Sequence, residues 1–147
     1  MMPPRARAGT LRFLIADDHG IVRHGLRELI MDAFHPDTVV EADRGRRVID
    51  EVRAQAWDLV VLDIGLPDMD GLEVLKAVKQ DRNLQVIPVI MLSSSVEGKD
   101  IKQAYELGAD SYIAKPVSIN GLFRAIEMLK NYWFEIVVLR KPMTLIE

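Results

Sequence analysis

The fold of this protein is decided by residues 59–71, the stretch Leu59-Val60-Val61-Leu62-Asp63-Ile64-Gly65-Leu66-Pro67-Asp68-Met69-Asp70-Gly71. Its first four residues are apolar and stop at Asp63, a pattern typical of a short strand that is buried on both faces of a sheet. Asp70 and Glu73 then have the spacing of a capping box, which predicts that a helix begins there. The stretch thus predicts a strand, a loop and a helix, the repeating unit of a parallel α/β fold.

The same unit occurs five times along the chain. The predicted strands are Leu11–Ala16, Thr38–Ala42, Leu59–Leu62, Ile87–Leu92 and Ser111–Ala114. The helices predicted to follow them are Gly20–Ala33, Arg46–Gln55, Gly71–Gln80, Glu97–Leu107 and Ile119–Trp133. This alternation predicts an α/β fold with a doubly wound, five-stranded parallel sheet.

Local signals support these helix limits. Ser94 and Glu97 also have capping-box spacing, and Gly108 stands where a helix end needs a left-handed residue. In the first helix, Ile21, Leu26, Leu29 and Ile30 are expected to share the face that covers the sheet.

Length and composition set the broad class of the protein. The 147 residues predict a disordered tail at 1–10, one folded domain at 11–133 and an apolar extension at 134–147. With 19 Lys+Arg against 22 Asp+Glu and a net charge of −3, no direct nucleic-acid binding is expected. The chain has no cysteine, and its apolar runs are too short to cross a membrane. We therefore expect a cytoplasmic protein without a membrane partner.

Polar residues stand at the ends of four of the five strands, where ligands bind in open parallel sheets. Asp17 and Asp18 end the first strand, Asp63 the third, Ser93 the fourth and Lys115 the fifth. Two carboxylates about 4 Å apart repel each other by roughly 4 kcal/mol at an effective dielectric of 20, so three of them need a cation. An all-oxygen site with few protein ligands favours Mg²⁺.

Such a site predicts acyl-phosphate chemistry. With the metal bound, one carboxylate remains both ligand and nucleophile, while Lys115 and the Ser93 hydroxyl contact the phosphoryl oxygens. Taken singly, Asp17 and Asp18 would be read as helix caps and Lys115 as a solvated charge. The joint pattern favours the phosphoryl site.

The three histidines do not predict a metal or phosphorelay centre. His19 and His24 do not share a helical face, and His35 precedes a proline. We expect them at the surface or at a helix start, with His19 at the pocket rim. No P-loop, HExxH, GxGxxG or nucleophile elbow is present.

Four segments of the chain resemble the receiver domain of response regulators in two-component systems, over residues 11–133. They are Phe13-Leu14-Ile15-Ala16-Asp17-Asp18-His19, Leu62 to Gly71 as quoted above, Met91-Leu92-Ser93-Ser94-Ser95, and Gly108-Ala109-Asp110-Ser111-Tyr112-Ile113-Ala114-Lys115-Pro116. The resemblance implies a flavodoxin-like receiver fold with strand order 2-1-3-4-5.

The resemblance also implies the roles of individual residues. Asp63 would be phosphorylated by a sensor histidine kinase. Mg²⁺ would be bound by Asp18 directly, by Asp17 through water, by Asp63 and by the backbone carbonyl of Gly65. The phosphoryl group would be contacted by Lys115, Ser93 and Ser94.

The resemblance further implies a cis bond before Pro116 and a switch pair made of Ser93 and Tyr112. The switch would act on the face formed by the fourth helix, the fifth strand and the fifth helix, and so control a downstream protein partner or a homodimer. The family's slow self-phosphorylation and self-dephosphorylation would not make the protein an enzyme in the ordinary sense.

The two ends of the chain resemble different subfamilies. Residues 15–26 are similar to receivers that precede a helix-turn-helix, whereas residues 129–134 are similar to stand-alone receivers that partner phytochromes. The apolar residues after the fifth helix make Tyr132, Trp133 and Phe134 candidates for a dimer contact. The alternatives are that this segment folds back on its own domain or is the stub of a linker.

Two other functions were weighed against the receiver interpretation. A haloacid-dehalogenase-like phosphatase needs a second carboxylate two residues after the nucleophile, where this chain has Gly65. An interaction module that works without phosphorylation is compatible with the same residues, and Asp63→Asn would leave its partner binding unchanged.

Overall fold

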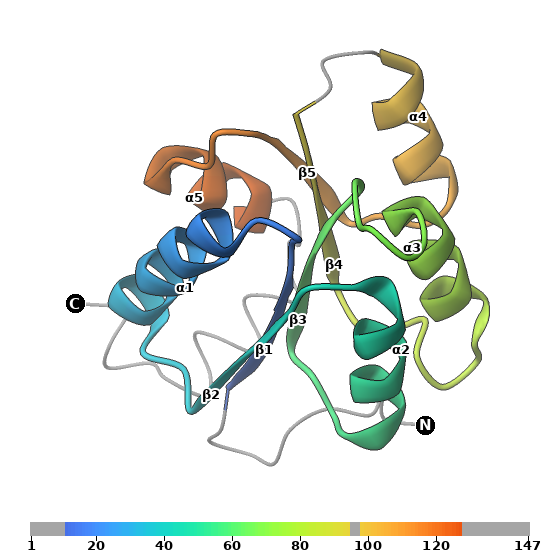
Figure 1. Ribbon diagram of the computed structural model, residues 1–147, viewed down its shortest axis with the longest axis horizontal. Coiled ribbons are helices and arrows are strands. Elements are labelled where there is room, and N and C mark those ends of the chain that lie inside the picture. Colours follow the sequence, from blue (N-terminus) through green and yellow to red (C-terminus); the bar gives the residue numbers. More distant parts are fainter. Residues whose placement is uncertain (1–10, 95–97, 128–147) are drawn as a thin grey trace.

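The sheet of this protein is built from five short strands, of which the central three are apolar runs buried on both faces. The computed structural model describes residues 11–94 and 98–127. The strands are β1 Arg12–Ala16, β2 Thr38–Ala42, β3 Leu59–Asp63, β4 Val89–Ser93 and β5 Ser111–Ala114. All are parallel, in the order β2-β1-β3-β4-β5, as predicted (Figure 1).

Helices cover both faces of this sheet. They are α1 Gly20–Phe34, α2 Gly45–Ala54, α3 Gly71–Gln80, α4 Gly98–Glu106 and α5 Ile119–Glu127. In Figure 1, α1 and α5 lie on one side of the sheet, and α2, α3 and α4 lie on the other. This is the doubly wound arrangement that the alternating pattern predicts.

Successive residues of each central strand enter opposite halves of the core. In β3, Val60 and Leu62 belong to the apolar cluster under α2 and α3, whereas Leu59 and Val61 belong to the cluster under α1 and α5. Because both faces are covered, these strands are continuous apolar runs and do not alternate with polar residues.

The signals for helix ends are found where the sequence predicts them. Asp70 caps α3, with its side chain accepting from the Leu72 N–H at 2.9 Å, and Glu73 completes the capping box. Gly108 follows α4 with a φ of +107°. A Cβ at Gly108 would also lie 2.9 Å from Lys79 Cγ, so glycine is required there by space as well as by conformation.

Two expectations about the elements were wrong. β4 begins at Val89 and not at Ile87, because the Ile87 N–H closes a turn on the Leu84 carbonyl at 3.0 Å, and Pro88 follows it. Ile21 does not share the buried face of α1: it is 89% exposed, whereas Leu26 and Ile30 are buried. With 3.6 residues per turn, Ile21 lies about 140° around the helix from Leu26 and about 180° from Ile30, so it points away from the side that covers the sheet.

Several predictions fall outside the described residues. They are the tail at 1–10, the Ser94–Glu97 capping box, the extension at 134–147 and the dimer candidates Tyr132, Trp133 and Phe134. Within 11–94 and 98–127, none of the helices is both long and apolar enough to cross a membrane.

Candidate functional site

The predicted site residues come together at the carboxyl end of the sheet. The strand register pairs Ala16 with Leu62, Asp63 with Leu92 and Ser93 with Ala114, so β1, β3, β4 and β5 end side by side. Asp17 and Asp18 follow β1, Asp63 and Ser93 are the last residues of β3 and β4, and Lys115 follows β5.

A lysine lies between two buried carboxylates at the centre of this site. Lys115 Nζ is 2.6 Å from Asp17 Oδ2 and 3.1 Å from Asp63 Oδ2. The side chain of Asp17 is fully buried, and those of Asp63 and Lys115 are 5% and 13% exposed. The ammonium therefore neutralises part of a negative charge that has little access to water.

Burial and charge change the proton affinities of this pair. Burial and the negative charge of Asp17 raise the pKa of Asp63, and Lys115 only partly offsets them. Burial acts to lower the pKa of Lys115, but the hydrogen bond with Asp17 and the charge of Asp63 outweigh it, so this pKa is raised. The site thus holds a charged lysine beside a carboxylate that is costly to ionise without a further cation.

The donor set of the site fits a hard cation. Asp17, Asp18, His19 and Asp63 each offer a ligand atom, and these atoms lie within 4.8 Å of one another. Among the residues that the structure describes, the buried Asp17 Oδ2 has Lys115 as its partner, with Nζ 2.6 Å away. Three carboxylates this close together supply the oxygen ligands that Mg²⁺ prefers.

His19 and Arg23 stabilise the acidic loop after β1. His19 Nδ1 lies 3.1 Å from Asp17 Oδ1 and 3.0 Å from Asp18 Oδ1, and its ring is 66% exposed at the rim of the site. Asp17 Oδ1 also accepts from the His19 N–H at 2.8 Å, so this carboxylate orders the loop and does not cap α1. The position at a helix start agrees with the expectation for His19.

Arg23 was missed by the sequence analysis. Its Nη1 donates to the Asp17 carbonyl at 2.7 Å, and its Nε donates to Glu41 at 3.2 Å. The sequence signal that could have indicated its role is its position, one turn into the helix that follows Asp17 and Asp18. Arg23 therefore ties the backbone that carries Asp17 to Glu41 of β2.

The Gly65 peptide lies against the Asp63 carboxylate. The Gly65 N–H donates to Asp63, and a Cβ at Gly65 would lie 3.9 Å from Asp63 Oδ2. The peptide is therefore next to the carboxylate cluster, and the role of its carbonyl as a metal ligand stays a prediction.

The predicted phosphate and switch residues lie on the β4 and β5 side of the site. Ser93 is buried, and its carbonyl accepts from the Lys115 N–H at 2.9 Å, while Ser94 is exposed. Tyr112 is half-buried and packs against the apolar cluster under α2 and α3. The Lys115–Pro116 bond is cis, the geometry that the resemblance implied.

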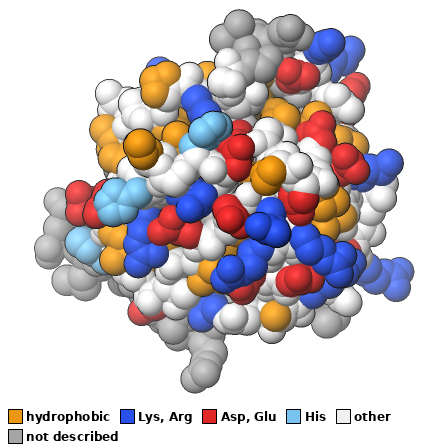
Figure 2. Space-filling view, viewed as in Figure 1, with side chains coloured by type: hydrophobic (Ala, Val, Ile, Leu, Met, Phe, Trp, Pro, Cys, Tyr) orange, Lys and Arg blue, Asp and Glu red, His pale blue; other side chains and the backbone are white. Residues whose placement is uncertain are grey.

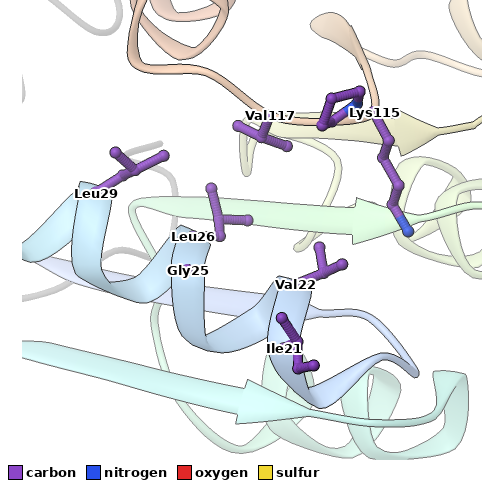
Figure 3. A pocket seen from close by; sticks show the side chains of 8 residues that line it. Ile21, Val22, Gly25, Leu26, Leu29, Lys115 and Val117 are labelled. Carbon is purple, nitrogen blue, oxygen red and sulfur yellow. The ribbon is translucent and has the colours of Figure 1, made fainter.

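An apolar groove leads from α1 to this site. It has a volume of about 380 Å³ and is lined by Ile21, Val22, Leu26 and Leu29 on one side and by residues 115–117 on the other. Figure 3 shows Val22 and Leu26 facing Val117, with the Lys115 side chain leaving the groove at one end. The exposed Ile21 stands at the same end as the Lys115 ammonium.

The face seen in Figure 2 carries acidic and basic side chains intermixed. On α2 the arginines are paired with acids one helical turn on: Arg46 Nε lies 3.5 Å from Asp50, and Arg47 Nε lies 3.0 Å from Glu51. No broad area of a single charge forms on this face among the described residues.

Comparison with known proteins agrees with this geometry. The family model described as "Response regulator receiver domain" matches residues 13–127. The response regulator protein VraR of Staphylococcus saprophyticus is 34% identical over 121 residues, which cover 82% of this chain and 57% of VraR. The chain thus spans little more than half the length of this curated relative.

Two solved structures represent the two subfamilies expected from the sequence. The phosphorylated cyanobacterial phytochrome response regulator RcpA is 29% identical with a TM-score of 0.72, over 85% of this chain and 94% of RcpA. A LuxR-family response regulator from Aurantimonas sp. is 30% identical with a TM-score of 0.69, over 80% of this chain and 83% of that one. The chain therefore belongs to the response regulator receiver domain family of two-component systems.

Proposed function

We propose that this receiver domain accepts a phosphoryl group on Asp63 from a phosphohistidine of a sensor histidine kinase, with Mg²⁺ as cofactor. The observation that carries the proposal is the Asp63 carboxylate at the end of β3, 3.1 Å from the Lys115 ammonium and within 4.8 Å of two further acidic ligands. Both Asp17 and Asp63 are paired with Lys115, but Asp17 has no exposed side-chain surface whereas Asp63 keeps 5%, so Asp63, the acid that the resemblance assigns, is the proposed nucleophile.

In the transfer, a carboxylate oxygen of Asp63 forms the new P–O bond, and the P–N bond to the donor imidazole breaks. The imidazole keeps the electron pair of that bond and the proton on its other nitrogen, so it leaves as the neutral ring. Mg²⁺ bound by the carboxylates would supply positive charge to the phosphoryl oxygens. The Lys115 ammonium, the Ser93 hydroxyl and Ser94 would contact those oxygens.

The same contacts supply the energy for a switch. Moving an equilibrium from 1:99 to 99:1 needs about 5.5 kcal/mol, and a hydrogen bond to a charged group contributes roughly 1.5–3 kcal/mol. One such contact is too weak, whereas two or three together with the metal can supply this energy. The buried Ser93 hydroxyl and the half-buried Tyr112 ring are the pair proposed to change position.

The proposed output surface is the face formed by α4, β5 and α5. Tyr105 and Ile119 are 38% and 37% exposed there, and Tyr112 lines a groove of about 330 Å³ with Arg124. A downstream protein or a second copy of the chain would bind this face in a phosphorylation-dependent way. The protein would act in the cytoplasm as a phosphoacceptor and not as an enzyme.

The apolar groove along α1 is the proposed docking surface for the kinase. A donor histidine has to reach Asp63 from outside, and the groove ends at Lys115 with the exposed Ile21 beside it. A helix of the kinase that packs on Ile21, Val22 and Val117 would bring its phosphohistidine to the site opening.

The test is intact mass spectrometry after incubation with phosphoramidate and excess Mg²⁺. The wild type is expected to gain one phosphoryl group and Asp63→Asn none. Asp50→Asn is the matched control, because Asp50 is 59% exposed on α2 and distant from the sheet end; it should be modified like the wild type. If neither phosphoramidate nor acetyl phosphate modifies the wild type, the result contradicts the proposal and favours the alternative of an interaction module that works without phosphorylation.

A further inference from the structure

The loop between β3 and α3 is attached to the start of α2 by one side chain. Asp68 Oδ1 accepts from the Gly45 N–H at 2.7 Å, and Asp68 Oδ2 accepts from the Arg46 N–H at 2.9 Å. Gly45 and Arg46 are the first two residues of α2. The contact spans more than twenty residues of sequence and joins two different units of the fold.

This contact replaces a cap that α2 lacks. The residue at the N-cap position, Arg44, provides no side-chain hydrogen bond to the helix. Free N–H groups at a helix start need acceptors, and a carboxylate is the favoured one because of the helix dipole. Burial acts to raise the pKa of Asp68, but the hydrogen bonds donated by the backbone N–H groups of Arg46 and Gly45 outweigh it, so this pKa is lowered.

Close packing surrounds the same contact. A Cβ at Gly45 would lie 2.5 Å from Met69 Cγ and 2.7 Å from Val74 Cγ2, so α2 approaches the loop as closely as a glycine allows. At the base of the loop, the Ile64 N–H donates to the Leu92 carbonyl at 2.9 Å, and the Gly71 N–H donates to the Ile64 carbonyl at 2.7 Å. The segment 64–71 is thus held at its base by β4 and at its far side by α2.

Gly65 lies between these two attachments. Its N–H donates to the Asp63 carboxylate, and its carbonyl is the metal ligand that the resemblance implies. A ligand that is a backbone carbonyl cannot be oriented by its own side chain, so its position depends on how the loop is held.

We propose that Asp68 is a positioning residue: by attaching residues 64–71 to the start of α2, it holds the Gly65 peptide in place for Mg²⁺ and couples α2 to the phosphorylation site. This inference rests on the proposed function, because it assumes that the cation binds at Asp63. Coupling between two sites is reciprocal, so Mg²⁺ binding should in turn stabilise the first turn of α2.

The direct test is titration with Mg²⁺ by calorimetry. Asp68→Ala should weaken Mg²⁺ binding roughly tenfold, at the lower end of what loss of a group supporting a metal ligand costs. Hydrogen exchange supplies a second readout: Mg²⁺ should slow exchange at the Gly45 and Arg46 amides in the wild type and leave it unchanged in Asp68→Ala.

A double variant separates positioning from stability. Arg44 has the extended backbone of an N-cap residue, so Arg44→Asp gives α2 a cap of its own. In Asp68→Ala/Arg44→Asp, thermal stability should recover while Mg²⁺ affinity stays low. Recovery of both, or an unchanged Mg²⁺ affinity in Asp68→Ala, would overturn the inference. A wild type that binds no Mg²⁺ would instead overturn the proposed function on which it rests.

Discussion

Replacing Lys115 by methionine tests how the acidic site is held together. The ammonium lies 2.6 Å from Asp17 Oδ2 and 3.1 Å from Asp63 Oδ2. Methionine keeps much of the apolar stem and removes the charge. Asp17, which is fully buried, and Asp63 would then remain side by side without a protein cation between them.

The size of the effect follows from these distances. A unit-charge pair about 3 Å apart is worth roughly 5–6 kcal/mol at an effective dielectric of 20. The cost of burying the ammonium offsets part of this, and removal of one partner from a buried ion pair generally costs about 3–5 kcal/mol. We therefore expect Lys115→Met to lower the free energy of unfolding in EDTA by about 3–5 kcal/mol. At roughly 4 °C per kcal/mol, this corresponds to a fall in Tm of about 12–20 °C.

The assay is urea unfolding followed by circular dichroism, in EDTA and in excess Mg²⁺. Because the cation replaces the lost positive charge, Mg²⁺ should stabilise Lys115→Met more than it stabilises the wild type. Lowering the pH should also reduce the deficit, since Lys115 acts to lower the pKa of Asp63 and its removal lets Asp63 take up a proton more readily. Lys76→Met, at an exposed position on α3, is the control and should change stability by less than about 0.5 kcal/mol.

Equal stability of Lys115→Met and the wild type in EDTA would refute this reasoning. It would mean that water or rearranged side chains already screen the two carboxylates. The same conclusion would follow if Mg²⁺ stabilised both proteins to the same extent.

Three further predictions concern the groove, the acceptor and the loop. Ile21→Asp should leave stability and modification by phosphoramidate unchanged, because Ile21 is 89% exposed. Phosphotransfer from an autophosphorylated sensor kinase of the source organism that reacts with the wild type should fall about tenfold. Equal transfer to the variant and the wild type would refute docking at this groove. Burial and the charge of Asp17 raise the pKa of Asp63 in the folded protein above 3.8. In EDTA, the free energy of unfolding of the wild type, measured by urea titration, should therefore fall as the pH rises from 3.8 through the folded-state pKa of Asp63. Asp63→Asn should lack this fall. Gly71→Ala places a Cβ 2.1 Å from the Asp63 carbonyl oxygen, so it should lower the free energy of unfolding by about 1–3 kcal/mol in thermal unfolding and slow phosphorylation. An unchanged free energy of unfolding would show that the loop can move to make room for the Cβ.

Much of the fold was predictable because its signals are local. The limits of α3 follow from the Asp70–Glu73 capping box, and the buried strands follow from apolar runs that need no alternation when helices cover both faces. The strand ends then bring Asp17, Asp63 and Lys115 together, since parallel strands share one carboxyl edge. These side chains were predictable from sequence for that reason.

The exposure of Ile21 could have been predicted, because 3.6 residues per turn place it about 140° around α1 from Leu26 and about 180° from Ile30, which are buried. The remaining features depend on contacts that sequence spacing does not reveal. Arg23 pairs with Glu41, but its contact at the site is with the Asp17 backbone carbonyl, and Asp68 contacts two backbone N–H groups of α2. Contacts with backbone groups leave no signal in the pattern of side-chain types. Both contacts were therefore found only in the structure.

Localising the phosphoryl group tests the central claim most directly. The wild type would be incubated with phosphoramidate and Mg²⁺ and then treated with borohydride, which reduces an aspartyl phosphate to an alcohol, before peptide mass spectrometry. The proposal predicts reduction at Asp63 and at no other aspartate of the site, with none in the sample prepared without phosphoramidate. Reduction at Asp17, Asp18 or Asp68, or at no aspartate although a phosphoryl group is bound, would contradict it.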